Sequence, residues 1–383
     1  MFIGMEASTP ALQGLWFVLI AVLWIGFFFL EGFDFGVGML LPFVGGKSDA
    51  KRRVMVSAIG PTWDGSEVWL LTAGGATFAA FPGWYATLFS ALYLPLFLVL
   101  VGLIARGISF EYRSMNPDTK WRFAFDWCNT IGSFVVSLVL GVGFANFVRG
   151  LPVAGTPPLV DGDFLQRFLS LFNGYGLLGG VLFVVLFAAH GAQYLGIKTK
   201  DEVGDAARKT ADLLAPVAAV LMAIFVVWGT LAYSTDNPFN GSWGQVVRWI
   251  AGILAVVCLV AASLLGRMGR PGLAFVASGL SIATMVASIF AAIYGTLGFA
   301  AARTPGGGLF EKPHFPSSVI DMSSAASTEM TLGLMRTFAF IMVPIVLIYT
   351  IWAYWVFRQR LNTVNIPTRS GVTAALKVDS AAG

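Results

Sequence analysis

Long stretches without a charged residue dominate the pattern of hydrophobic and polar positions along this chain. Eight such runs approach or exceed the roughly 20 residues that span a hydrocarbon core. One run, residues 68–105, carries Pro82 and Gly83 near its middle, which predicts two helices joined by a tight turn. The pattern therefore predicts nine transmembrane helices, at about 9–40, 64–82, 84–106, 126–149, 168–197, 213–235, 248–267, 271–302 and 336–358.

Composition supports an all-α integral membrane protein. Of the 383 residues, 57% are hydrophobic and only 11% are charged, so lipid rather than water is the expected surrounding of most helices. We expect one transmembrane domain over residues 1–360, followed by a polar cytoplasmic tail over residues 361–383. Because four crossings return the chain to its starting side, helices 1–4 and 5–8 have the arrangement of parallel repeats, with helix 9 left over.

Basic residues are concentrated in alternate loops, and this asymmetry predicts the orientation. Most of the 24 Lys and Arg follow helix 1 or fall in every second loop after it, and in the C-terminal tail. Positively charged loops stay in the cytoplasm, which places the N-terminus outside and the C-terminus inside. The same asymmetry accounts for the net charge of +4, so the basic balance implies no nucleic-acid site.

Helix 1 ends in two acids and three glycines. Glu31 and Asp34 lie in its C-terminal half, where the helix dipole disfavours negative charge, so they need a cation, a bound proton or water. Gly32 and Gly36 form a face of small residues that allows another helix to approach closely. Two interpretations remain open: interfacial acids paired with the basic residues at 51–53, or a functional site.

A second acidic block opens helix 2. Asp64 and Glu67 are three residues apart and therefore share a face, on which they could relay protons. Acids in a first turn are also favoured by the helix dipole and need no function. However, residues 64–81 at about 1.5 Å each barely span the hydrocarbon core, which draws Asp64 into the membrane and favours a functional role.

The remaining titratable residues indicate little chemistry. The chain has 2 His, His190 and His314, which is few for haem ligation, and no metal site is predicted. His190 is expected to be a hydrogen-bonded structural residue. The 2 cysteines, Cys128 and Cys258, fall within predicted spans and are expected to be buried free thiols. Asp126, at the start of helix 4, is most simply a charge at a helix N-terminus.

Several motifs together resemble subunit II of the bacterial cytochrome bd-type quinol oxidases, including their cyanide-insensitive relatives. The resemblance extends from helix 1 to helix 9. It rests on Glu31-Gly-Phe-Asp-Phe-Gly-Val-Gly-Met39, Gly60-Pro-Thr-Trp-Asp-Gly-Ser-Glu-Val-Trp69, Thr72-Ala-Gly-Gly-Ala-Thr-Phe-Ala-Ala-Phe-Pro82, Arg106 with Glu111-Tyr-Arg113, Gly150-Leu-Pro152, and Tyr354-Trp-Val-Phe-Arg358. Two departures are Ser66, where the family often has Asn, and residues 324–332, which differ from the usual pattern before helix 9.

The resemblance implies two four-helix bundles plus one peripheral helix, paired with a haem-bearing subunit I. That partner would hold two b haems and one d haem, with ubiquinol or menaquinol as electron donor, while this chain would ligate no haem and hold no catalytic residue. It assigns Asp64 to a proton pathway from the cytoplasm. The predicted pathway comprises Asp64, Glu67, Ser66, Asp34 and Glu31, supported by the motif residues Trp63, Gly65, Arg106, Gly32 and Gly36.

The expected function is that of a non-haem subunit of a quinol:oxygen oxidoreductase in the bacterial cytoplasmic membrane, which stabilises subunit I and supplies protons for O2 reduction to water. Expected partners are subunit I, a small single-helix accessory subunit, quinone and membrane lipid. Two alternatives remain. A proton-coupled secondary transporter would use the same acids as a lone chain, and a purely structural subunit of the same oxidase would not need them.

Overall fold

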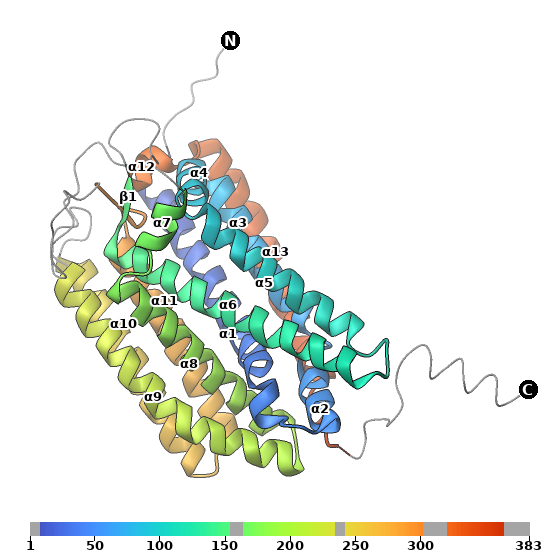
Figure 1. The fold of residues 1–383 in the computed structure, drawn as a ribbon. Helices are drawn as coiled ribbons and strands as arrows, with labels where there is room; N and C mark the ends of the chain where they lie inside the picture. The colour runs from blue at the N-terminus through green and yellow to red at the C-terminus, as the bar shows by residue number, and fades with distance from the viewer. Residues whose placement is uncertain (1–7, 154–163, 234–241, 302–319, 364–383) are drawn as a thin grey trace, which may run out of the picture.

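The computed structural model describes residues 8–153, 164–233, 242–301 and 320–363, and helices make up most of them (Figure 1). In chain order the elements are α1 (Pro10–Val44), α2 (Asp49–Ile59), α3 (Trp63–Ala80), α4 (Pro82–Ala91), α5 (Tyr93–Tyr112), α6 (Thr119–Arg149), β1 (Leu151–Val153), α7 (Phe164–Ser170), α8 (Gly174–Lys198), α9 (Asp201–Tyr233), α10 (Ser242–Arg267), α11 (Pro271–Ile293), β2 (Phe299–Ala301), α12 (Met322–Ala325) and α13 (Glu329–Val356).

Eight of these helices are long and apolar enough to cross a membrane, namely α1, α5, α6, α8, α9, α10, α11 and α13. The expectation of an all-α membrane protein is thereby confirmed. α3 is not among the eight, because Asp64 and Glu67 lie in its first turns and small residues fill its middle. Most of the expected polar tail, residues 364–383, lies outside the described residues.

Two predicted helices are too long: α11 ends at Ile293 instead of 302, and α8 begins at Gly174 instead of 168, after the separate helix α7. Other helices begin before the charge-free runs that predicted them, because helices continue beyond the hydrocarbon core. α6 begins at Thr119 instead of 126, where the Asp118 side chain accepts a hydrogen bond from the Lys120 backbone N–H and caps the helix. α9 begins at Asp201 instead of 213. The short amphipathic helix α2 escapes a search for charge-free runs altogether, because charged residues fill its exposed face.

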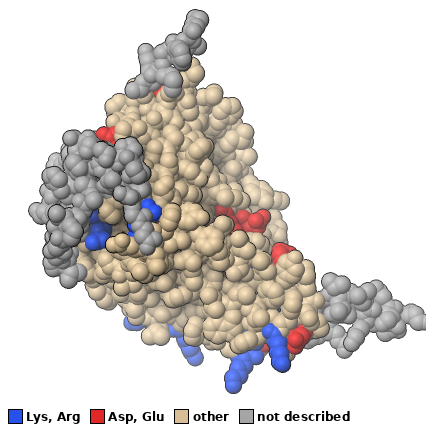
Figure 2. Space-filling model, turned by 45° about the horizontal axis from the view of Figure 1, so that its top comes forward, with Lys and Arg blue, Asp and Glu red and all other residues tan. Residues whose placement is uncertain are grey.

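α1 is the helix around which the others are arranged. It packs against α8, α3 and α6, and also touches α11, α2 and α13. Figure 1 shows α2 at the lower end of the bundle, and α4, α7 and α12 at the upper end. In Figure 2 uncharged residues make up most of the visible surface, and Lys and Arg lie along the lower edge and in a second group at the left, beside the grey residues. This distribution suits a flank that faces lipid.

The contact between α1 and α8 depends on two glycines. A Cβ atom on Gly36 would overlap the backbone carbonyl of Phe187 and lie 2.9 Å from Cα of Gly191. Gly191 is equally close to the backbone at Gly36. The two helices therefore meet backbone to backbone, as small residues at membrane helix crossings permit.

A short sheet joins the ends of two distant helices. β1 follows α6 and pairs in parallel with β2, which follows α11, so that Leu151 lies opposite Phe299. Each strand comes after a glycine with positive φ, Gly150 at 88° and Gly298 at 80°. Glycine suits both positions because side chains disfavour this backbone conformation.

The glycine crossing yields a first prediction. Gly36→Ala forces α1 and α8 apart and should lower the free energy of unfolding by about 1–3 kcal/mol, the usual cost of overpacking. Thermal unfolding of the purified protein measures this effect. Gly272→Ala is the matched control, because a Cβ there meets nothing within 4 Å. Equal midpoints for the two variants would show that the close crossing is not needed.

Candidate functional site

A buried arginine on α5 contacts carboxylates from two other helices. Arg106 Nη1 donates to Glu31 Oε2 at 2.7 Å and to Glu67 Oε1 at 2.9 Å. Its Nη2 lies 3.9 Å from Asp34 Oδ2. The side chains of Arg106, Glu31 and Asp34 are wholly buried, whereas that of Glu67 is 22% exposed. α1, α3 and α5 are thus joined through one guanidinium.

Aromatic rings form the apolar wall of this site. Cζ of Arg106 lies 4.7 Å from the centre of the Phe35 ring and 5.2 Å from that of Phe110. Trp63, at the start of α3, stacks on Phe110 with ring centres 5.0 Å apart. Rings favour an arginine placed over their faces, and they exclude water that would weaken the ion pairs.

Charge is not balanced at this cluster. One guanidinium faces three carboxylates, so full ionisation would leave two negative charges without a cation among the described residues. Glu31 Oε1, both carboxylate oxygens of Asp34, and Arg106 Nε and Nη2 make no hydrogen bond. Buried charges without partners are costly. The site therefore has the capacity to hold protons or ordered water.

Hydroxyl groups extend the site toward the lower end of the bundle. The Ser66 hydroxyl lies beside Asp34 and is 3.1 Å from the Tyr354 hydroxyl. Ser66 also donates to the backbone carbonyl of Thr62 at 3.2 Å. Sequence reasoning noted Tyr354 only as part of a motif, because nothing local links α13 to α3.

Asp64 is placed apart from the arginine. Its side chain is exposed on the outer face of α3, and within the described part of the chain it forms no ion pair with Arg106. Gly65 is exposed beside it, and a Cβ there would meet nothing within 4 Å. Glu67 lies between the two, since it contacts Arg106 and is three residues from Asp64 on α3. The structure thus brings Glu31, Asp34, Ser66 and Glu67 together and leaves Asp64 at their edge.

The remaining motif residues serve packing. Gly36 makes the crossing with α8, and a Cβ on Gly32 would lie 2.9 Å from the Phe187 ring. His190 is wholly buried, with Nδ1 2.7 Å from the Ser278 hydroxyl, which agrees with the structural role expected for it. Throughout the described ranges no group of three or more His, Cys, Asp or Glu residues is placed to hold a metal ion.

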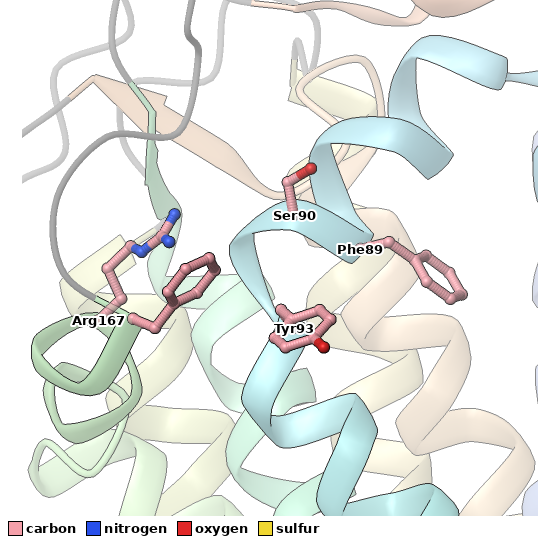
Figure 3. Close-up of a pocket in the computed structure, with 5 residues that line it drawn as sticks. Phe89, Ser90, Tyr93 and Arg167 are labelled. Carbon is pink, nitrogen blue, oxygen red and sulfur yellow. The ribbon is translucent and has the colours of Figure 1, made fainter.

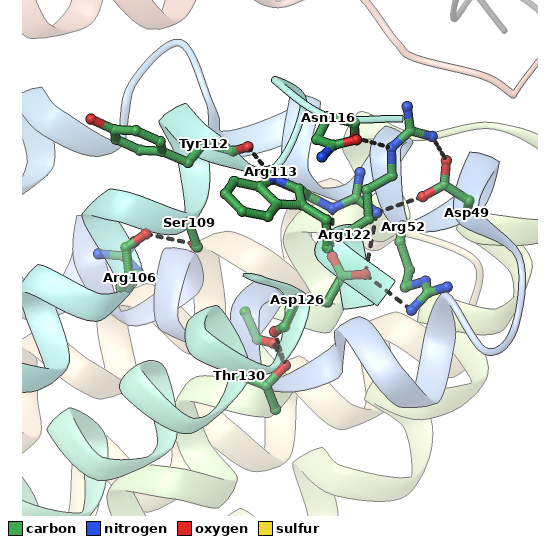
Figure 4. A network of polar contacts seen from close by, with 12 residues as sticks. Asp49, Arg52, Arg106, Ser109, Tyr112, Arg113, Asn116, Arg122, Asp126 and Thr130 are labelled. Atoms are coloured by element: carbon green, nitrogen blue, oxygen red, sulfur yellow. Dashed lines mark hydrogen bonds and ion pairs between the residues drawn. The ribbon is translucent and has the colours of Figure 1, made fainter. Parts of the chain in front are cut away.

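A second ion-pair network ties α2 to α6 and to Arg113, which directly follows α5 (Figure 4). Asp126 accepts from Arg113 at 2.5 and 3.2 Å and lies 3.0 Å from Arg52. Asp49 pairs with Arg113 at 2.8 Å and with Arg122 at 2.7 Å. The interpretation of Asp126 as a charge at a helix N-terminus is wrong, because α6 begins at Thr119 and Asp126 is a buried partner of two arginines.

The arginines of this network lower the pKa of Asp49. Burial alone raises the pKa of the carboxyl, but the charges and hydrogen bonds of Arg113 and Arg122 outweigh burial and hold the pKa below its ordinary value. Two of the three basic residues of α2 pair elsewhere than with helix 1: Arg52 pairs with Asp126, and Lys51 pairs with Glu202 at 2.5 Å. The cation that Glu31 and Asp34 require is Arg106.

The fold and the buried ion pairs define a multi-pass helical membrane protein with a polar site inside it. Residues 12–357 match the family model described as cytochrome bd terminal oxidase subunit II. The chain is 35% identical to cytochrome bd-I ubiquinol oxidase subunit 2 of Escherichia coli K12, covering 93% of this chain and 96% of the relative. It is also 35% identical to cytochrome bd ubiquinol oxidase subunit 2 of Bacillus subtilis, covering 92% and 97%.

A solved structure has the same fold. The bd oxidase of Geobacillus thermodenitrificans matches with a TM-score of 0.65 and 16% identity, covering 90% of this chain and 97% of that one. The chain therefore belongs to the family of subunit II of cytochrome bd terminal oxidases. It is a subunit of a respiratory oxidoreductase and a multi-pass protein of the bacterial inner membrane.

Removal of the central cation gives a second prediction. Arg106→Gln leaves three carboxylates without a partner, and breaking a buried pair in this way costs about 3–5 kcal/mol. The variant should therefore unfold at a clearly lower temperature than wild type, or fail to accumulate. Adding Glu31→Gln should recover part of the loss, since it removes one uncompensated charge. Arg358→Gln, an exposed arginine on the C-terminal side of α13, is the control and should unfold like wild type.

Acid should weaken the network at Asp49. Because the pKa of Asp49 is lowered in the folded chain, its contribution is complete above the unfolded value of about 3.9 and is lost as pH falls through the folded value. Asp49→Asn should thus cost about 1 kcal/mol at pH 7, as expected for a partly exposed pair. The difference in unfolding midpoint between wild type and variant should shrink below about pH 4. A difference that grows on acidification would contradict this account.

Proposed function

We propose that this chain is the non-haem subunit of a quinol:oxygen oxidoreductase, where it stabilises a haem-bearing subunit I and supplies protons for reduction of O2 to water. Family membership supports the complex, and the names of the relatives support ubiquinol as donor, with menaquinol as the other candidate. The two b haems and the d haem belong to the partner in this proposal. A small single-helix accessory subunit completes the assembly.

We further infer nine crossings, with α3 as the ninth. α3 packs along α1, and its 18 residues at about 1.5 Å each extend for roughly 27 Å, close to the thickness of a hydrocarbon core. The basic loops support an outer N-terminus and a cytoplasmic C-terminus. On this inference the lower end of Figure 1, with α2, faces the cytoplasm.

This arrangement fits two four-helix bundles with α13 at the periphery. One bundle consists of α1, α3, α5 and α6, and the other of α8, α9, α10 and α11. The parallel pairing of β1 with β2 supports it, because the two strands follow the last helix of each bundle. The positive φ angles of Gly150 and Gly298 just before them add a second correspondence. Parallel repeats about an axis normal to the membrane bring such segments side by side.

The observation that carries the proton role is the excess of buried carboxylates around Arg106. In this proposal Glu67, which is partly exposed, exchanges protons with the cytoplasmic side and with the buried pair Glu31 and Asp34. Each transfer moves one proton between carboxyl oxygens, directly or through water, and the Ser66 hydroxyl offers a further relay to Asp34. Asp64 then takes the proton from Glu67 and, because it is exposed on the outer face of α3, passes the proton to subunit I.

Conservative variants test this route in the whole complex. Asp64→Asn, Glu67→Gln and Asp34→Asn each keep the shape of the side chain but remove a proton carrier, so O2 reduction should slow by at least about tenfold. The optical bands of the haems should be unchanged, which separates slow proton delivery from failed assembly. Glu202→Gln, an exposed acid paired with Lys51, is the control and should turn over like wild type.

The alternatives make different predictions. Wild-type turnover in all three variants would leave the chain with a purely structural role. Proton-coupled solute uptake by proteoliposomes holding this chain alone, with no haem bands in whatever copurifies with it, would favour a secondary transporter instead.

A further inference from the structure

A groove opens on the upper part of the molecule between α7 and the junction of α4 with α5 (Figure 3). It has a volume of about 470 Å³ and is lined by Phe89, Ser90, Tyr93, Phe164 and Arg167. Phe164 and Arg167 come from α7, while the other three come from α4 and the first residue of α5. Neither the buried acids nor the ion pairs of α2 lie near these residues in the chain or in the fold (Figure 1).

Arg167 gives the groove a positive charge. Its Cζ lies 4.8 Å from the centre of the Phe164 ring. Its Nε is buried and makes no hydrogen bond, and no carboxylate of the described residues forms an ion pair with it. A guanidinium held beside a ring with donors to spare is suited to an anion with several oxygens, above all a phosphate.

The rest of the groove is apolar and continues down α5. The ring centres of Tyr93 and Phe164 are 5.6 Å apart. Below Tyr93 the same side of α5 presents exposed apolar side chains at helical spacing, Phe97, Leu100, Ile104 and Ile108. From Tyr93 to Ile104 this track extends for about 16 Å, which is close to half of a roughly 30 Å hydrocarbon core.

Position in the fold agrees with the boundary between headgroups and acyl chains. α7 lies between β1 and the start of α8, at the opposite end of the bundle from α2 (Figure 1). Phe164, Leu165 and Leu169 of α7 are more than half exposed, as in a short helix resting on a membrane surface. A cation above a track of apolar side chains matches the shape of one phospholipid.

We propose that this groove binds a membrane phospholipid, with its phosphate on Arg167 and an acyl chain along the Tyr93 to Ile104 side of α5. The charge of Arg167 matches the phosphate of a lipid headgroup, and the open apolar track, about one leaflet long, matches its acyl chain. The site is independent of the proton role proposed above.

Lipid retention tests the proposal in the intact oxidase complex. Wild-type complex, Arg167→Gln and Ser90→Trp are washed in detergent, and bound phospholipid per complex is counted by native mass spectrometry. Each variant should lose one phospholipid that wild type retains. Arg167→Gln removes the cation, whereas Ser90→Trp fills the groove and leaves the cation in place. Readdition of phosphatidylglycerol should show at least about tenfold weaker binding to Arg167→Gln than to wild type, the size expected for a charged hydrogen bond.

Arg336→Gln is the matched control, because Arg336 is an exposed arginine near the same end of the bundle and outside the groove. It should retain as many lipids as wild type. Equal lipid counts in all four proteins would overturn the proposal, as would a polypeptide helix seated in the groove in a structure of the complex. Binding of inorganic phosphate as tight as that of phosphatidylglycerol would also overturn it, since the acyl track would then contribute nothing.

Discussion

The guanidinium of Arg106 determines how α1, α3 and α5 meet, because carboxylates on α1 and α3 have no other cation of the described chain within ion-pair distance. Glu31 and Asp34 lie in the C-terminal half of α1, where the helix dipole opposes negative charge. Their burial is tolerable only next to a positive charge, and even then one cation does not balance three acids. Both the packing of these helices and the proposed proton chemistry follow from that imbalance.

The backbone contact between α1 and α8 makes this arrangement possible. Gly36 lies two positions beyond Asp34 and lets α8 approach at backbone distance, which shields the acids on that side. On the other side Phe35 and Phe110 cover the guanidinium. Farther toward the same end, Asp126 and Asp49 connect α2, α6 and the residue after α5 through three arginines. The acidic cluster around Arg106 thus lies between the close crossing of α1 with α8 and the ion-pair network of Asp49 and Asp126.

Hydropathy alone predicted most of the long helices, because each one must present an apolar length to lipid. The helix dipole also identified Glu31 and Asp34 as acids in need of a cation. The identity of that cation was not predictable, since Arg106 is 75 residues from Glu31 in the chain and only the packing of α5 on α1 brings them together. Asp126 was misjudged for a related reason: α6 extends beyond its apolar run, so the first turn lies elsewhere.

The pair Asp64 and Glu67 shows the limit of helical periodicity. Three positions on a helix differ by about 60° in direction, which is enough to place one side chain against Arg106 and the other on the exposed face. Spacing predicted a shared face but not where the boundary of the site would fall. The amphipathic groove at α7 was likewise invisible in the sequence, because it forms only where α7 meets the start of α5.

Infrared difference spectroscopy of the intact complex tests the central claim most directly, that the acids around Arg106 hold exchangeable protons. Wild type at neutral pH should show the carbonyl stretch of a protonated carboxyl group, shifted in D2O and diminished in Asp34→Asn or Glu31→Gln. A spectrum without such a band, or a band that both variants leave unchanged, would contradict the account.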